Sequence, residues 1–127
     1  MKRTILLFII LWISNAIHSQ KQQAISIIPQ PVSINSGTGV FALPAQITIV
    51  TDKDRNLIKI QQLLSSQISS VTGKKVVNVI SDKASAKSIS LFISPDNTIP
   101  KEGYRLKVTT NGIAVTANDA AGIFYGV

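Results

Sequence analysis

The sequence predicts a domain that combines β-strands and helices around one apolar core. Apolar residues recur at helical spacing over residues 52–71, and they alternate with polar residues over residues 104–117. Hydrophobic residues make up 45% of the 127 positions, which favours a folded core over a disordered chain. The length excludes a parallel eightfold barrel, which needs about 250 residues, and it excludes a complete two-domain enzyme.

The N-terminus has the pattern of a secretory signal peptide. Lys2 and Arg3 precede an unbroken apolar run at residues 5–13, and small and polar residues follow at positions 14–19. A positive start, a short apolar run and a small-residue cleavage zone together define such a peptide. A permanent membrane span needs about 20 apolar residues, so we expect a signal peptide at residues 1–19 and no permanent span.

We expect cleavage after Ser19, with Ala16 as the alternative, and a mature domain of residues 20–127 in the periplasm or outside the cell. The net charge of +7 then falls to +5, because 11 basic and 6 acidic residues remain. His18, the single histidine, leaves with the peptide, and the chain has no cysteine. The mature domain therefore has neither residue type.

The mature domain begins with extended segments. Pro29 and Pro31 exclude a helix around them. Residues 32–34 and 40–43 are short strand candidates, separated by a turn rich in Gly, Ser and Asn. Residues 46–51 are β-branched and predict a further strand.

Residues 52–71 predict the clearest helix. Its start can be capped by Asp52 or Asp54, where a carboxylate also favours the positive end of the helix dipole. Gly73 is a natural C-terminal stop. One stripe of apolar residues follows the helical period: Leu57, Ile60, Leu64, Ile68 and Val71.

Two more strands are predicted at residues 75–80 and 88–94. The polar link at residues 81–87 has room for one helical turn.

A short helix is predicted over residues 120–127, capped by Asn118 or Asp119. An apolar helix this short is unstable alone, so we expect further protein beyond Val127, the domain being truncated before a partner.

A β-hairpin is the strongest local signal. Tyr104, Leu106 and Val108 alternate with polar residues, and the alternation resumes at residues 113–117. Asn111-Gly112 between them is expected to supply the positive φ angles of a tight turn. One face of the hairpin is apolar, so it is predicted to cover a core on one side only.

The mature chain predicts no catalytic residue, no cofactor-binding residue and no metal ligand. Without His or Cys, neither a nucleophilic triad nor a typical zinc site can be built. Glycoside hydrolysis by two carboxyl groups needs both to face one cleft. We interpret the acids instead as helix caps, solvated link residues and, for one glutamate, a surface residue: Asp52, Asp54, Asp119, Asp82, Asp96 and Glu102.

Nucleic acid is not expected as a partner. Lys74-Lys75 is the only adjacent basic pair of the mature chain, and no aromatic platform accompanies it. Gly37-Thr38-Gly39 joins two short strand candidates, which does not fit a dinucleotide loop. The aromatic residues Tyr104, Phe124 and Tyr125 could stack on a sugar, but they fit packing positions equally well.

Four motifs in order resemble the N-terminal domain of bacterial β-N-acetylhexosaminidases, family 20 of the glycoside hydrolases. They are Ile27-Ile28-Pro29-Gln30-Pro31 with Gly39-Val40-Phe41-Ala42-Leu43, Glu102-Gly103-Tyr104-Arg105-Leu106-Lys107-Val108, Asn111-Gly112-Ile113-Ala114-Val115-Thr116-Ala117 and Ala120-Ala121-Gly122-Ile123-Phe124-Tyr125-Gly126-Val127. The resemblance implies an α+β fold, a β-sheet with helices packed on one side, which precedes a catalytic (β/α)8 barrel. It also implies substrate-assisted hydrolysis of terminal N-acetylhexosamine residues, by an Asp-Glu pair of the barrel that no residue here matches.

The sequence therefore predicts an accessory N-terminal domain of an exported β-N-acetylhexosaminidase, inactive by itself. Its expected partner is the catalytic barrel in cis. N-acetylhexosamine glycans are a second candidate partner. The alternative is a free-standing exported glycan-binding module that uses Tyr104, Tyr125 and an exposed sheet face.

Overall fold

A computed structural model describes residue 27 and residues 30–127 of the chain. The chain divides into two units, residues 1–36 and residues 37–127, and each is considered by itself. The predicted signal peptide at residues 1–19 lies outside the described residues. Within the described part of the chain, no helix has both the length and the apolar character needed to cross a membrane.

Neither of the first two strand candidates forms. Residues 32–34, in the first unit, and residues 40–43, in the second, are irregular. The side chains of Val32 and Val40 are 107% and 81% exposed. A strand is stabilised by its ladder partner and by burial of one face, and these segments have neither in the part of the chain that the structure describes.

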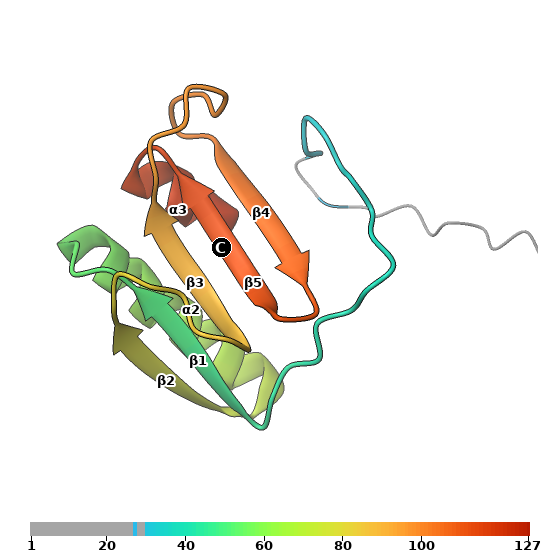
Figure 1. The fold of residues 1–127 in the computed structure, drawn as a ribbon. Coiled ribbons are helices and arrows are strands. Elements are labelled where there is room, and N and C mark those ends of the chain that lie inside the picture. Colours follow the sequence, from blue (N-terminus) through green and yellow to red (C-terminus); the bar gives the residue numbers. More distant parts are fainter. Residues whose placement is uncertain (1–26, 28–29) are drawn as a thin grey trace, which may run out of the picture. The chain divides into compact units, whose positions relative to one another are not determined.

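The second unit is a five-stranded sheet with two helices on one of its faces (Figure 1). The strand order is β2-β1-β3-β5-β4. This is the expected α+β arrangement with helices packed on one side. The elements are β1 (Gln46–Thr51), α2 (Arg55–Thr72), β2 (Lys75–Ile80), β3 (Ser88–Ile93), β4 (Tyr104–Thr109), β5 (Gly112–Ala117) and α3 (Ala120–Gly126).

Four strands are parallel and one is antiparallel. β1 pairs in parallel with β2 and β3, β3 pairs in parallel with β5, and β4 pairs antiparallel with β5. The link at residues 81–87 crosses over β1 on the face opposite the helices (Figure 1). It consists of bends and a turn, so the predicted helical turn is wrong. The crossing explains why Val50, which points away from the helices, is only 1% exposed.

The core lies between the sheet and the two helices. Every second residue of the central strands points into it, as the two-residue period of a strand requires. Its buried members are Ile47, Ile49, Leu57, Ile60, Leu64, Ile89, Leu91, Val115, Ala117 and Ile123.

Helix α2 begins and ends as its sequence indicates. The Asp54 carboxylate accepts hydrogen bonds from the N–H groups of Asn56 and Leu57 at 2.8 and 3.0 Å. Gly73 closes the helix in the left-handed conformation, with φ of 67°. Asp54 is therefore the cap, and the helix starts three residues later than predicted.

The buried side of α2 differs from the predicted stripe at two positions. Val71 is 85% exposed, whereas Gln61, which is polar, is 2% exposed. The Gln61 amide donates hydrogen bonds to the carbonyl oxygens of Ile49 and Val79 at 2.7 and 3.1 Å. These two bonds offset the cost of burying a polar side chain.

The hairpin forms, but its turn is displaced by one residue. Thr109 pairs with Gly112, so Thr110 and Asn111 are the two turn residues. Asn111 does not have a positive φ angle, so the predicted turn conformation is wrong. A Cβ on Gly112 would lie 2.7 Å from the Ser88 carbonyl oxygen, so the glycine serves the close approach of β5 to β3.

Helix α3 is capped by Asp119, whose carboxylate accepts a hydrogen bond from the Gly122 N–H at 2.8 Å. Gly122 is a close-packing position. A Cβ there would meet the Gly103 carbonyl oxygen and would lie 2.7 Å from the Ala117 Cβ. Asn118, the other cap candidate, instead bonds the loop before β4, donating to the Asp96 and Ile99 carbonyl oxygens.

Candidate functional site

The acidic residues of the second unit mainly serve local structure. Asp54 and Asp119 cap the two helices, and Asp52 accepts a hydrogen bond from the Asp54 N–H at 2.8 Å. Asp82 is exposed on the link. Among the described residues, no group of three or more acids or histidines could hold a metal ion.

The Asp96 carboxylate makes more hydrogen bonds than the sequence suggests. One carboxylate oxygen accepts from both the N–H and the hydroxyl of Thr98, and the other is 2.8 Å from the Arg105 guanidinium. The Thr98 hydrogen bonds and the Arg105 contact lower the pKa of Asp96 from 3.8 to about 2. Asp96 therefore ties the β3–β4 loop to β4, rather than being a freely solvated link residue.

Glu102 lies in the same loop, beside the start of α3. Its backbone N–H donates to the Asp119 carboxylate at 3.3 Å, and its φ angle is 62°. The side chain is exposed. A single exposed carboxylate does not form the pair that two-carboxylate glycoside hydrolysis requires.

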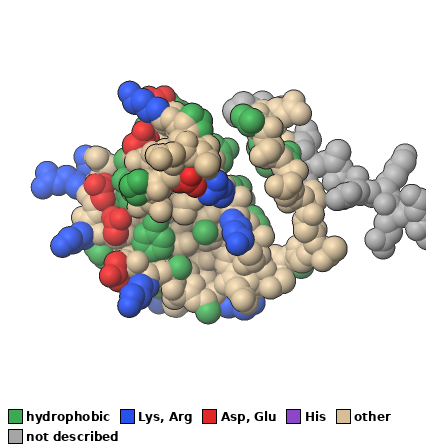
Figure 2. Space-filling view, turned by 45° about the horizontal axis from the view of Figure 1, so that its top comes forward, with side chains coloured by type: hydrophobic (Ala, Val, Ile, Leu, Met, Phe, Trp, Pro, Cys, Tyr) green, Lys and Arg blue, Asp and Glu red, His purple; other side chains and the backbone are tan. Residues whose placement is uncertain are grey.

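Basic side chains are spread over the surface rather than gathered into one patch, as the face in Figure 2 shows. Lys74 is used internally, because its ammonium donates to the carbonyl oxygens of Leu43 and Pro44. Lys74 and Lys75 therefore do not act as a free basic pair.

The three candidate aromatic residues lie on or beside α3. Tyr104 is 38% exposed, and its ring lies beneath the helix, where a Cβ on Gly126 would be 3.0 Å from the Tyr104 Cδ2 atom. The rings of Phe124 and Tyr125 are 5.8 Å apart at 65°, an edge-to-face pair. An edge-to-face pair does not offer one flat platform to a sugar.

A second apolar group lies on the helix-bearing side of the edge strand β4. Leu106 and Val108 are register partners of Val115 and Ile113, which pack in the core, so they point to the same side. Leu106 and Val108 nevertheless remain 45% and 55% exposed. The apolar face of the hairpin is therefore only partly covered by the described chain.

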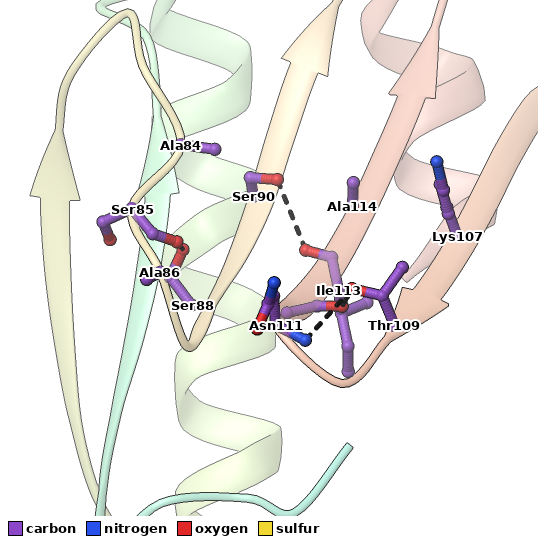
Figure 3. Close-up of a pocket in the computed structure, with 11 residues that line it drawn as sticks. Ala84, Ser85, Ala86, Ser88, Ser90, Lys107, Thr109, Asn111, Ile113 and Ala114 are labelled. Atoms are coloured by element: carbon purple, nitrogen blue, oxygen red, sulfur yellow. Dashed lines mark hydrogen bonds between the residues drawn. The ribbon is translucent and has the colours of Figure 1, made fainter. Parts of the chain in front are cut away.

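The opposite face of the sheet carries a shallow pocket of about 340 Å³ (Figure 3). Residues 84–86 of the link form one wall, and Lys107 and Thr109 of β4 form the other. Ser88, Ser90 and Ala114 lie between them. These small residues are far apart in the sequence, so no sequence pattern predicts the pocket.

The fold and these sites define an α+β domain in which apolar side chains remain exposed on the helix-bearing side. Residues 24–127 match the sequence model described as glycosyl hydrolase family 20, domain 2. The chain therefore belongs to glycosyl hydrolase family 20. A search of curated proteins gave no significant match.

Three solved structures of similar fold come from Streptomyces. Two are of the Streptomyces plicatus β-hexosaminidase, a mutant with the product GlcNAc and a complex with Thio-NAglucal, each with a TM-score of 0.70. The family 20 β-N-acetylhexosaminidase from Streptomyces coelicolor has a TM-score of 0.60. Each is 26% identical over 79% of this chain, which spans 19% of that chain's length.

Proposed function

We propose that this chain is the non-catalytic N-terminal domain of an exported β-N-acetylhexosaminidase, and that it packs against a catalytic (β/α)8 barrel in cis and stabilises it. The match of residues 24–127 to domain 2 of family 20 carries this proposal. Export rests on the signal-peptide pattern of residues 1–19. Hydrolysis of terminal N-acetylhexosamine residues would belong to the barrel.

The surface that would receive the barrel is the docking surface, defined as Leu106, Val108, Phe124 and Tyr125. These four side chains are between 45% and 60% exposed. Burial of apolar surface contributes roughly 25 cal/mol per Å², and contiguous exposed apolar groups commonly mark interaction sites. A barrel covering them would stabilise both parts of the protein.

The first test is an activity assay with an aryl N-acetyl-β-glucosaminide. We expect no turnover by this 127-residue chain, because its acids act as caps and loop ties. Robust turnover that disappears in Glu102→Gln would overturn the accessory role. The DNA following the Val127 codon gives a second test, since an open frame that encodes a barrel is expected there.

The docking surface is tested in the gene product that includes the barrel. Leu106→Glu is expected to lower the unfolding temperature of that protein but not of the present chain, in which Leu106 is already exposed. Val79→Glu is the matched control, because Val79 is 37% exposed on the opposite face of the sheet. An equal effect of both substitutions would refute this docking surface.

The glycan-binding module is the alternative. The contact of Tyr104 beneath α3 favours a packing role for that ring over a sugar platform. Calorimetry of this chain with chito-oligosaccharides at millimolar concentration separates the two functions. Heat that disappears in Tyr125→Ala would favour the module, and no heat would exclude it.

A further inference from the structure

The pocket on the helix-free face of the sheet is hollow because its floor residues are small. Ser90 pairs with Ala114 across β3 and β5, and Ala114 pairs with Lys107 of β4. Ser90 is only 3% exposed, so it lies at the bottom of the hollow. Only at the β4 edge does a long side chain, that of Lys107, rise beside the hollow (Figure 3).

The wall opposite Lys107 is held in place by hydrogen bonds. The Ser88 hydroxyl donates to the Ser85 carbonyl oxygen at 2.6 Å, which fixes the link against β3. The N–H and the ammonium of Lys87 donate to the carbonyl oxygens of Asn111 and Thr110, both at 2.6 Å. The link is thereby tied to the hairpin turn, so the pocket is formed before any ligand arrives.

The Ser90 hydroxyl presents an acceptor rather than a donor to the pocket. The Ser90 hydroxyl donates to the Ile113 carbonyl oxygen, and the Thr109 hydroxyl donates to the Gly112 carbonyl oxygen. Both O–H protons are therefore used in hydrogen bonds within the protein, and the lone pairs of the Ser90 oxygen remain as acceptors for a ligand. A ligand that carries hydroxyl donors matches such a floor.

The charge of the pocket is positive. Lys107 has no hydrogen bond or ion pair within the part of the chain that the structure describes, and the pocket lining contains no carboxylate. The Asn111 side-chain amide at the rim can both donate and accept. An anionic group on the ligand would thus meet an available ammonium and no opposing charge.

We propose that this pocket binds a sugar that carries an oxyanion, either a carboxylate or a sulfate. The oxyanion pairs with Lys107, and sugar hydroxyls donate to the Ser90 oxygen. The volume of about 340 Å³ lies at the small end of ligand pockets and suits one sugar ring. This site is separate from the docking surface, since it lies on the other face of the sheet.

The test is a titration of the isotope-labelled full chain, followed by the backbone amide signals in nuclear magnetic resonance spectra. The probes are glucuronate, N-acetylglucosamine 6-sulfate, neutral N-acetylglucosamine and inorganic sulfate. We expect at least one acidic sugar to shift the signals of Ser90, Ala114 and Lys107 at millimolar concentration. Which acidic sugar binds distinguishes carboxylate from sulfate.

Two variants and one control assign the binding to the pocket. Lys107→Gln is expected to weaken it by about two- to fivefold, as an exposed ion pair implies, and Lys107→Arg to retain it. Ala114→Gln fills the hollow and is expected to abolish binding. Lys75→Gln, on the same face at the far edge of the sheet, should leave it unchanged.

Four outcomes would count against the proposal. The first is the absence of shifts with both acidic sugars. The second is that neutral N-acetylglucosamine binds as tightly as the acidic sugars, which would remove the role of the oxyanion. The third is that inorganic sulfate binds as tightly as the acidic sugars, which would remove the role of the sugar. Binding that persists in Ala114→Gln would place the ligand elsewhere and would also count against the pocket.

Discussion

Replacing Thr51 by valine is expected to stabilise the domain. Thr51 is 0% exposed on the helix side of β1, and its hydroxyl has no hydrogen-bond partner among the described residues. A buried hydroxyl without a partner costs about 1–3 kcal/mol, and valine keeps the β-branched shape while removing that polar atom. Taking the lower limit, we expect Thr51→Val to raise the free energy of unfolding by about 1 kcal/mol.

For a domain of this size, 1 kcal/mol corresponds to an increase in unfolding temperature of about 4–8 °C. Thermal unfolding followed by circular dichroism at 222 nm measures it, with urea unfolding as a second readout. Gln61→Leu is the matched contrast, because Gln61 is buried but makes two hydrogen bonds, and its loss should lower stability. A lower unfolding temperature for Thr51→Val would refute the reasoning, since it would mean that the hydroxyl is hydrogen-bonded.

The remaining predictions use the same unfolding assay. Gly122→Ala should destabilise the domain by about 1–3 kcal/mol, because the added Cβ overpacks the contact with Gly103 and Ala117. The control is Gly37→Ala, where a Cβ meets open space and stability should change by less than about 0.5 kcal/mol. Equal effects of the two substitutions would contradict the crowding at Gly122. Asp54→Ala should lower the free energy of unfolding by about 0.5–2 kcal/mol, because two N–H groups of α2 lose their acceptor. An unchanged unfolding midpoint would contradict the capping role of Asp54. Since folding lowers the pKa of Asp96 from 3.8 to about 2, its stabilising contribution is present above about pH 5 and is lost progressively as the pH falls through about 2. Asp96→Asn should flatten the stability profile between pH 4 and pH 2, and an unaltered slope there would argue against the hydrogen bonds that Asp96 accepts from Thr98 and Arg105.

The elements with strong periodic patterns could be predicted from the sequence. The stripe over α2, the β-branched run of β1 and the alternation in the hairpin all gave the observed element type. These signals are local, because each depends on residues within one helix or strand. The resemblance in motif order added the α+β class and the helices on one side.

What escaped prediction depends on contacts between distant segments. Gln61 is buried because it reaches the carbonyl oxygens of two strands, which no helical pattern reveals. The sequence pattern predicts a turn role for Gly112, but in the fold this glycine makes room for the Ser88 carbonyl oxygen of a neighbouring strand. The pocket arises in the same way, because Ser90 and Ala114 meet only when β5 inserts between β3 and β4.

That insertion also has a consequence for the order in which the chain can fold. Within residues 37–127, only the β4–β5 ladder joins strands that follow each other through a tight turn. β3 gains its partner β5 only after the intervening loop and β4 have been made. Pairings of such sequence separation close slowly, because loop entropy is lost before the contacts form. During synthesis, β1, α2 and β2 can assemble first, and β3 then has one unpaired edge until residue 117 has emerged from the ribosome. The central strand of the finished sheet therefore completes its pairing late, together with the β4–β5 hairpin.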